Sequence, residues 1–202
     1  MKLFATLATA AAATVLLIAS PALAGPFGVE KGTPKSQLNI LRVVDESTPF
    51  KTYEISVTQP NGEISFYDVD LTDKTGVCRL TAFGNSHYDD NTGAAIRPVF
   101  NSFKDALTKK YGKSDDFDYL HDGSKLTAPD QFSEGLDSGE RSLISFWDSD
   151  TTTMPADIQS ISLEAEAIDK TSTYVVVTYE YSNFNDCFAM KPRDNSSASK
   201  GL

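Results

Sequence analysis

The sequence predicts an α+β fold: an antiparallel sheet of about six strands, in two meander-like runs, packed by one main helix and one or two short helices. Segments that alternate apolar and polar residues occur in two groups of three, and short turn sequences join the strands within each group. One long amphipathic stretch separates the groups. A parallel sheet needs a helix between most strands, so this single crossover favours an antiparallel arrangement.

The first group follows a predicted short helix. Thr33 can cap that helix over residues 32–44, with Leu38, Leu41 and Val44 recurring at three-residue spacing. The strands then follow at residues 53–57, from residue 64 onward after the turn Pro60-Asn61-Gly62, and at residues 77–83.

The main helix is predicted from a single apolar stripe. Phe100, Phe103, Leu107 and Tyr111 fall on one helical face, and lysines lie off that face. Gly112 follows at the position where helices commonly end. The helix is therefore expected to pack on the sheet and to end at Tyr111.

The second group of strands follows an acidic region. Residues 113–140 are interrupted by Gly and Pro, and they predict loops with one short helix over residues 130–136. Alternating patterns then predict strands at residues 142–147, 157–168 and 173–182.

The first 24 residues are typical of a signal for export. Lys2 precedes an apolar run over residues 3–19, and small residues then predict cleavage after Ala24. A membrane anchor is the alternative interpretation, but the run is shorter than the roughly 20 residues that a span needs. The style of the signal is bacterial, so we expect a periplasmic or secreted protein.

Composition excludes several classes of function. The chain of 202 residues has a formal charge of −10, and −11 without its first 24 residues, which contain one Lys and no acid. Nucleic acid and anionic lipid attract basic surfaces, so neither is an expected partner. Two His and two Cys are too few for a typical zinc site, and no cofactor is expected. The length predicts a single domain over residues 25–190 and a polar, disordered tail over residues 191–202.

Cysteine usage agrees with export. Cys78 and Cys187 are the only cysteines, and a protein that leaves the reducing cytosol is expected to join them in a disulfide. Two unpaired thiols are the alternative. A redox-active pair would normally have the Cys-x-x-Cys spacing, which is absent.

Negative charge is concentrated in one segment. Residues 113–170 contain 14 acidic and 4 basic side chains. Such a surface can steer a basic protein partner, and the candidate contact residues are Asp115, Asp116, Asp118 and Asp122. The competing interpretation, which we favour for the charge by itself, is a solvated set of loops that keeps an exported protein soluble.

A catalytic alternative rests on one loop. His87, Asp89 and Asp90 offer an imidazole and two carboxylates, the groups that a small periplasmic hydrolase needs. Neighbours in sequence rarely reach the geometry of a base that activates a nucleophile, and no known hydrolase motif supports the loop. A solvated connection between strand and helix is the favoured interpretation.

Two further candidates are weaker. Aspartates cluster at residues 68–73, 115–118 and 148–150, but none of these segments matches the calcium-binding loop with its terminal Glu. Trp147 can anchor a sugar or peptide, although a single Trp in a strand is more often part of the core. No metal site is therefore predicted.

The order of motifs resembles that of a group of small exported bacterial proteins. The opening segment from Gly28 to Leu38 resembles the start of modules of the BamE and β-lactamase-inhibitor-protein type. The later Tyr-Gly-Lys at residues 111–113, Phe-Trp at 146–147 and the final pair of strands resemble exported proteins of uncharacterised function. Ser114 stands where Pro is expected, and Thr33-Pro34 where Met-Thr is expected. The resemblance implies a binding or assembly protein without a catalytic site.

The leading hypothesis is therefore an exported, non-enzymatic protein that binds another protein. It would act as an inhibitor, an immunity-type factor or an envelope assembly factor, on a partner with a basic surface. The hydrolase that uses the loop from His87 to Asp90 remains the alternative.

Overall fold

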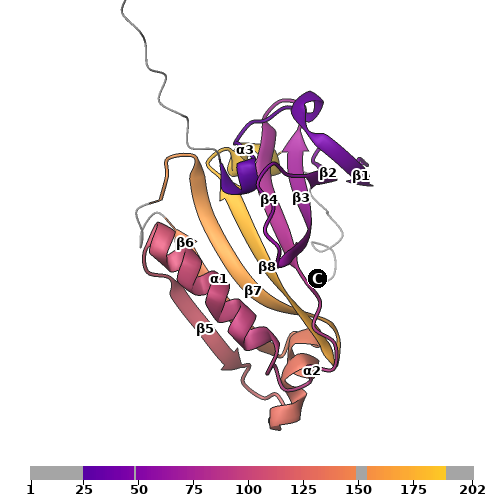
Figure 1. Cartoon of the computed structure of the whole chain (residues 1–202), viewed down its shortest axis with the longest axis vertical. Coiled ribbons are helices and arrows are strands. Elements are labelled where there is room, and N and C mark those ends of the chain that lie inside the picture. The colour runs from indigo at the N-terminus through magenta and orange to yellow at the C-terminus, as the bar shows by residue number, and fades with distance from the viewer. Residues whose placement is uncertain (1–24, 48, 149–153, 190–202) are drawn as a thin grey trace, which may run out of the picture.

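The computed structural model describes residues 25–47, 49–148 and 154–189, and its main element is one antiparallel sheet of eight strands (Figure 1). The predicted signal segment, the predicted tail and Asp150 lie outside these residues. The strands are β1 Asn39–Asp45, β2 Lys51–Ser56, β3 Ile64–Thr72, β4 Gly76–Gly84, β5 Asp115–Leu120, β6 Arg141–Asp148, β7 Ile158–Asp169 and β8 Ser172–Tyr181. The helices are η1 Pro26–Gly28, η2 Lys35–Gln37, α1 Ile96–Tyr111, η3 Pro129–Gln131, α2 Phe132–Asp137 and α3 Phe184–Phe188.

The predicted α+β class and antiparallel sheet are confirmed, with eight strands in place of about six. Strands β1 to β4 form one meander and β5 to β8 form a second, on either side of α1 in the sequence. The spatial order is β1-β2-β3-β4-β8-β7-β6-β5, so the last strands of the two meanders pair at the centre.

The predicted helix over residues 32–44 is wrong. Only η2 is helical there, and β1 pairs with β2 along the edge of the sheet. The pairing register shifts on either side of Leu41 and again at Val44, and both side chains are exposed. Leu41 and Val44 are therefore the extra residues of two β-bulges, and their three-residue spacing in the sequence resembles a helical face.

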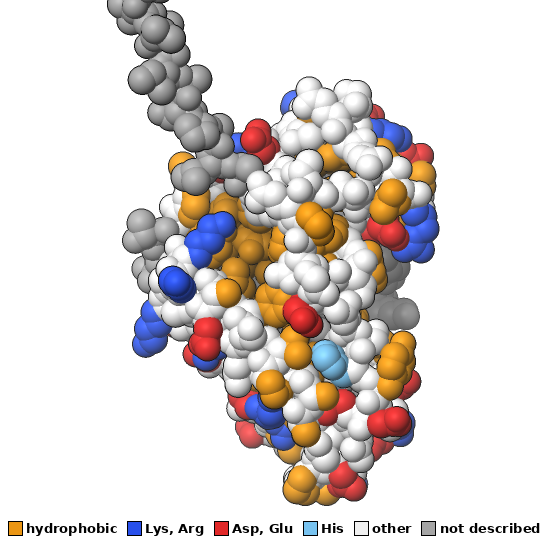
Figure 2. Space-filling view, viewed as in Figure 1, with side chains coloured by type: hydrophobic (Ala, Val, Ile, Leu, Met, Phe, Trp, Pro, Cys, Tyr) orange, Lys and Arg blue, Asp and Glu red, His pale blue; other side chains and the backbone are white. Residues whose placement is uncertain are grey.

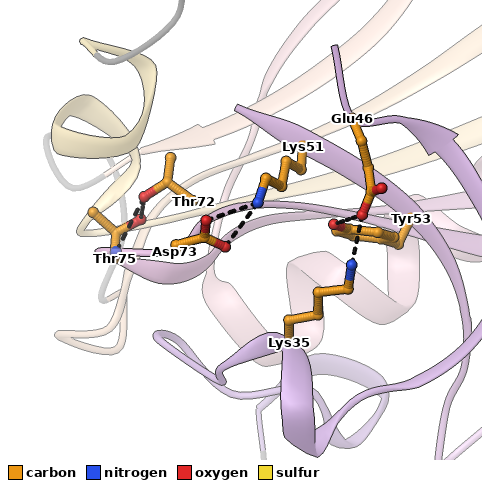
Figure 3. Close-up of polar contacts among 7 residues, drawn as sticks. All are labelled: Lys35, Glu46, Lys51, Tyr53, Thr72, Asp73 and Thr75. Atoms are coloured by element: carbon orange, nitrogen blue, oxygen red, sulfur yellow. Dashed lines mark hydrogen bonds and ion pairs between the residues drawn. The ribbon is translucent and has the colours of Figure 1, made fainter. Parts of the chain in front are cut away.

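Polar contacts hold η2 and the end of β1 against β2 (Figure 3). Glu46 accepts hydrogen bonds from the Lys35 ammonium and from the hydroxyl of Tyr53, whose ring is buried in β2. The Lys35 hydrogen bond, followed by that of Tyr53, lowers the pKa of the Glu46 carboxyl. Nearby, Lys51 is paired with Asp73 at 2.7 Å. The two hydrogen bonds of Glu46 favour an extended chain after η2.

Strand β5 is the second element that differs from the prediction, because residues 113–120 were expected to form an acidic loop. β5 pairs with β6 along its whole length. Asp118 is bound by Arg97 of α1 at 2.7 Å, and Asp116 by Lys104 of α1 at 2.6 Å. These tertiary ion pairs let an acidic segment form an edge strand.

The core lies on the face of the sheet that α1 and α2 cover (Figure 1). The predicted stripe of α1 contributes Phe100, Leu107 and Tyr111, which are buried. Gly112 ends the helix as predicted, with a φ of 95° that favours glycine. Trp147 is fully buried and donates its indole N–H to the Gly112 carbonyl at 2.9 Å, so it occupies the core position favoured from sequence. None of the described helices is long and apolar enough to cross a membrane.

The predicted disulfide between Cys78 and Cys187 is confirmed. Cys78 lies in β4 and Cys187 in α3, 109 positions further along the chain. Both are fully buried beside Phe50 and Phe184, in a cluster separate from the main core. The bond therefore attaches the short C-terminal helix to the centre of the sheet.

Removing this disulfide is expected to lower the free energy of unfolding by about 3–4 kcal/mol, because a long loop of the unfolded chain is no longer closed. Urea unfolding of the oxidised and reduced protein measures the difference. The double variant Cys78→Ser/Cys187→Ser is the control, since reductant should not change its midpoint. Equal midpoints for oxidised and reduced wild type would contradict the prediction.

Candidate binding surface

The loop proposed for the hydrolase contains a buried aspartate that anchors α1. Asp90 accepts hydrogen bonds from the backbone N–H groups of Ala95 and Ile96 at 2.8 and 3.0 Å, and from the Thr173 hydroxyl at 2.9 Å. A carboxylate at this end of a helix satisfies free N–H groups and favourably opposes the helix dipole. Asp90 thus joins the start of α1 to β8.

The other two residues of that loop have different surroundings. His87 forms backbone hydrogen bonds in both directions with Thr173, and its Nε2 is buried with no hydrogen-bond partner among the described residues. Asp89 is exposed and has a φ of 57°. The hydrolase hypothesis needs a base that is held against a nucleophile, and the hydrogen bonds of this loop to β8 and α1 support a structural role instead.

The four aspartates predicted as a partner surface separate in the structure. Asp116 and Asp118 face α1, while Asp115 points to the opposite face of the sheet and Asp122 lies in the exposed turn after β5. The hydrogen bond from Arg97 lowers the pKa of the Asp118 carboxyl. For Asp116, burial opposes the hydrogen bonds from Lys104 and two serines, and the pKa is lowered on balance. Two of the four carboxylates are therefore already paired with cations.

A larger acidic surface lies on the face of the sheet opposite α1, which we call the open face. Among the described residues, only Phe50 and α3 pack on it, at the end where Arg79 contacts Phe184. The six inner strands direct seven carboxylates and one guanidinium to this face: Glu54, Asp68, Asp70, Asp148, Glu164, Glu166, Glu180 and Arg79. The edge strands add Asp45, Asp115 and Arg42.

Two acids of this face are in ion pairs, Glu54 with Arg42 and Asp70 with Arg79. Burial, followed by the charge of Glu54, raises the pKa of Asp68 against the opposing charge of Arg42, and one of its carboxylate oxygens is buried without a hydrogen-bond partner in the described part of the chain. Burial and the neighbouring Glu164 likewise raise the pKa of Glu166. Carboxylates held in this way would be stabilised by a cation brought from outside.

An apolar hollow of about 440 Å³ lies on the same face. Phe66 and Phe83 stack there with their ring centroids 4.4 Å apart, and Tyr174, the exposed Ile168 and two serines also line the hollow. Burial, followed by the charge of Glu166, raises the pKa of the Tyr174 hydroxyl. Apolar and acidic groups therefore meet within one surface.

The helix-covered face contains another apolar hollow, of about 280 Å³, between η1 and the end of α1 (Figure 2). Its walls include Tyr111, Ile158 and Tyr181. At its rim Lys31 is paired with Asp157, so the charges there largely cancel. This hollow offers no electrostatic preference for a ligand.

The aspartates that were considered for calcium do not converge. Asp68 and Asp70 lie on the open face, whereas Asp73 binds Lys51. Within the described ranges, no group of three or more His, Cys, Asp or Glu residues is arranged to hold a metal ion.

Comparison of the chain with protein-family models, with curated proteins and with solved structures found no match. The resemblance to modules of the BamE and β-lactamase-inhibitor-protein type therefore stays a prediction.

The acidic surface on the open face was not predicted from the sequence. The signal was present, because Glu54, Asp68, Asp70, Glu164 and Glu166 each alternate with apolar residues along a strand. Those residues come from three segments of the chain. Only the order of the strands brings them to one face.

The matched variants Asp90→Asn and Asp89→Asn test the structural role of the loop. Asp90→Asn replaces one acceptor of buried hydrogen bonds by a donor, so we expect it to lower the free energy of unfolding by about 1–3 kcal/mol. Asp89→Asn should change it by less than about 0.5 kcal/mol, as exposed substitutions usually do. Urea unfolding measures both, and equal effects would contradict the assigned role of Asp90.

Asp68→Asn tests the electrostatic state of the open face. The pKa of Asp68 is raised in the folded protein, so its ionised form destabilises the fold above that pKa, and the penalty disappears as the pH falls below the unfolded value near 4. Asp68→Asn should therefore raise the urea midpoint at pH 7, and the gain should vanish near pH 3.

Asp118→Asn is expected to have the opposite effect on the stability of the protein. The pKa of Asp118 is lowered in the fold, so its charge stabilises the protein above the unfolded pKa, and that stability is lost as the pH falls through the folded pKa. This variant should be less stable than wild type at pH 7. If both variants shift the midpoint in the same direction, the assigned environments are wrong.

Proposed function

We propose that this chain is an exported, non-catalytic protein that binds a second protein with a basic surface through the open face. One observation carries the proposal: seven carboxylates and a single guanidinium point to this face from the six inner strands, and after the ion pairs of Asp70 with Arg79 and of Glu54 with Arg42 the acids still outnumber the cations. Such an imbalance on a surface that the described helices leave largely uncovered attracts a cationic partner and speeds its association.

The raised pKa values of Asp68 and Glu166 support the same proposal. On a surface whose charge serves only solubility, acidic side chains can lie far apart, and each carboxylate is then well hydrated. Here the two side chains are only partly accessible and lie beside like charges, an arrangement that lowers stability. Contact with Lys or Arg of a partner would relieve this repulsion.

Export of the protein rests on the predicted signal in residues 1–24, and it is compatible with the disulfide, because such bonds persist outside the reducing cytosol. The resemblance drawn from the sequence favours an inhibitor, an immunity-type factor or an envelope assembly factor. Each of these roles requires a stable surface for protein recognition. A sheet attached to α3 by a disulfide supplies such a surface in a fixed conformation.

Charge reversal of the open face should abolish capture of the partner. The bait is the immobilised protein, and the extract comes from the envelope and culture medium of the source cells. The double variant Glu164→Lys/Glu166→Lys is expected to weaken binding at least about tenfold, equivalent to ~1.4 kcal/mol, because two attractive contacts become repulsive. Binding by wild type should also fall as salt is raised.

Two controls locate the contact. Asp105→Lys reverses an exposed charge on α1 and should leave capture unchanged. Asp122→Lys reverses an exposed residue of the surface predicted from sequence that lies in the turn after β5, outside the open face. If Asp122→Lys abolishes capture while Glu164→Lys/Glu166→Lys does not, the contact lies around this turn and the open-face assignment is wrong.

A further inference from the structure

A line of mostly apolar side chains crosses the open face at right angles to the strands. The pairing register places residues of β3, β4, β8, β7, β6 and β5 directly opposite one another along this line. Neighbouring strands lie about 4.8 Å apart, so the five intervals span roughly 24 Å. The cross-strand row, in this order, consists of Phe66, Phe83, Val176, Glu164, Ile144 and Phe117.

Further apolar side chains widen the two ends of the cross-strand row. At one end, Tyr174 and Ile168 line the hollow beside the stacked rings of Phe66 and Phe83. At the other end, Phe117 and Tyr119 of β5 are 46% and 47% exposed. Exposed aromatic side chains at a rim of polar residues are typical of protein-binding sites.

Carboxylates interrupt the cross-strand row near its middle. Glu164 lies between Val176 and Ile144 in the register, and Glu166 lies on the same strand and face, opposite Tyr174. The pattern along the line is therefore apolar, acidic and apolar again. A complementary ligand has cationic groups between two apolar groups.

We infer that the cross-strand row docks a cationic amphipathic helix of the partner protein, with its apolar side chains on the two ends of the row and a Lys or Arg on Glu164 and Glu166. This inference rests on the proposed function and names the part of the partner that the open face recognises. A helix of about 16 residues spans the roughly 24 Å of the row, at 1.5 Å per residue. Apolar residues at spacings of three and four in its first and last turns, with Lys or Arg on the same side of its middle turns, supply the matching contact stripe.

Charge argues against two other occupants. A second copy of the chain has a net charge of −10 and would bring its own carboxylates against these. An anionic membrane surface would be repelled for the same reason. Neutral apolar ligands would leave Glu164 buried without a counter-ion, at a cost in free energy.

Synthetic peptides test the inference on the full mature chain. The main probe is a fluorescently labelled peptide of about 18 residues, made of Leu and Lys, with Leu at helical spacings of three and four in its first and last turns and Lys on the same side of its middle turns. A peptide of the same composition in scrambled order and an oligolysine of the same charge serve as reference probes. Fluorescence anisotropy gives each dissociation constant. We expect the amphipathic peptide to bind at least tenfold more tightly than either reference.

Variants of the protein then separate apolar from ionic recognition. Phe117→Ser removes an exposed ring at one end of the row, and Phe83→Ser removes a ring from the hollow. Each should weaken binding of the amphipathic peptide at least fivefold, with little effect on oligolysine. Leu41→Ser is the matched control, because it removes an exposed apolar side chain from the distant edge strand β1 and should change neither. Thermal unfolding of each variant checks that it remains folded. If Phe83→Ser does not fold, the binding measured with Phe117→Ser alone tests the inference.

The outcomes distinguish the inference from the proposed function. If the three peptides bind equally well and Phe117→Ser has no effect, the row is not a docking site, although charge-dependent capture of the partner can persist. If Glu164→Lys/Glu166→Lys leaves capture of the natural partner unchanged, the proposed function itself fails. A dimer in sedimentation velocity that Phe117→Ser dissociates would show that a second copy occupies the row, and it would overturn the inference.

Discussion

The antiparallel pairing of β4 with β8 is the constraint on which the rest of the structure depends. It joins two four-stranded meanders that are otherwise separated in sequence by α1 and the acidic region. Without it, β4 and β8 would each become an edge strand with unpaired backbone groups, which favours aggregation. The disulfide lies beside this junction, because Cys78 belongs to β4 and Cys187 to the helix that follows β8. Backbone pairing and a covalent bond thus hold the same pair of segments together.

The same pairing separates the charges of the molecule onto two faces. On the face toward α1, the acids of β5 meet Arg97, Lys104 and Arg141, so their charges are balanced within the protein. On the open face, Arg42 pairs with Glu54 and Arg79 with Asp70, while Glu164 and Glu166 lie beside each other, and burial and this like charge raise the pKa of Glu166. An acidic segment in the sequence therefore does not correspond to one acidic surface. Strand alternation divides it, and strand order then adds Glu54, Asp68 and their neighbours from elsewhere.

The parts of the fold that could be predicted are those whose signals are local. The stripe from Phe100 to Tyr111 and the terminal Gly112 identify α1, since a helix is formed by residues close in sequence. The alternating strands β2 to β4 and β6 to β8 were likewise recognised. β1 was missed because it carries no alternating pattern, and β5 was missed because its alternation of acidic and aromatic residues from Asp116 to Tyr119 lies within a segment whose acidic residues and turn formers indicate loops. β1 is interrupted by bulges, and β5 is acidic enough that only cations from other elements stabilise it.

The amino-acid sequence alone determined the class of the fold, the main helix and the pairing of the two cysteines. These follow from periodicity and residue counts, which need no knowledge of distant contacts. The tertiary structure decided which carboxylates share a surface and which are neutralised. It also decided that Phe66 and Phe117, 51 positions apart in the sequence, belong to one row. Such relations depend on the register between strands, which long-range pairing sets.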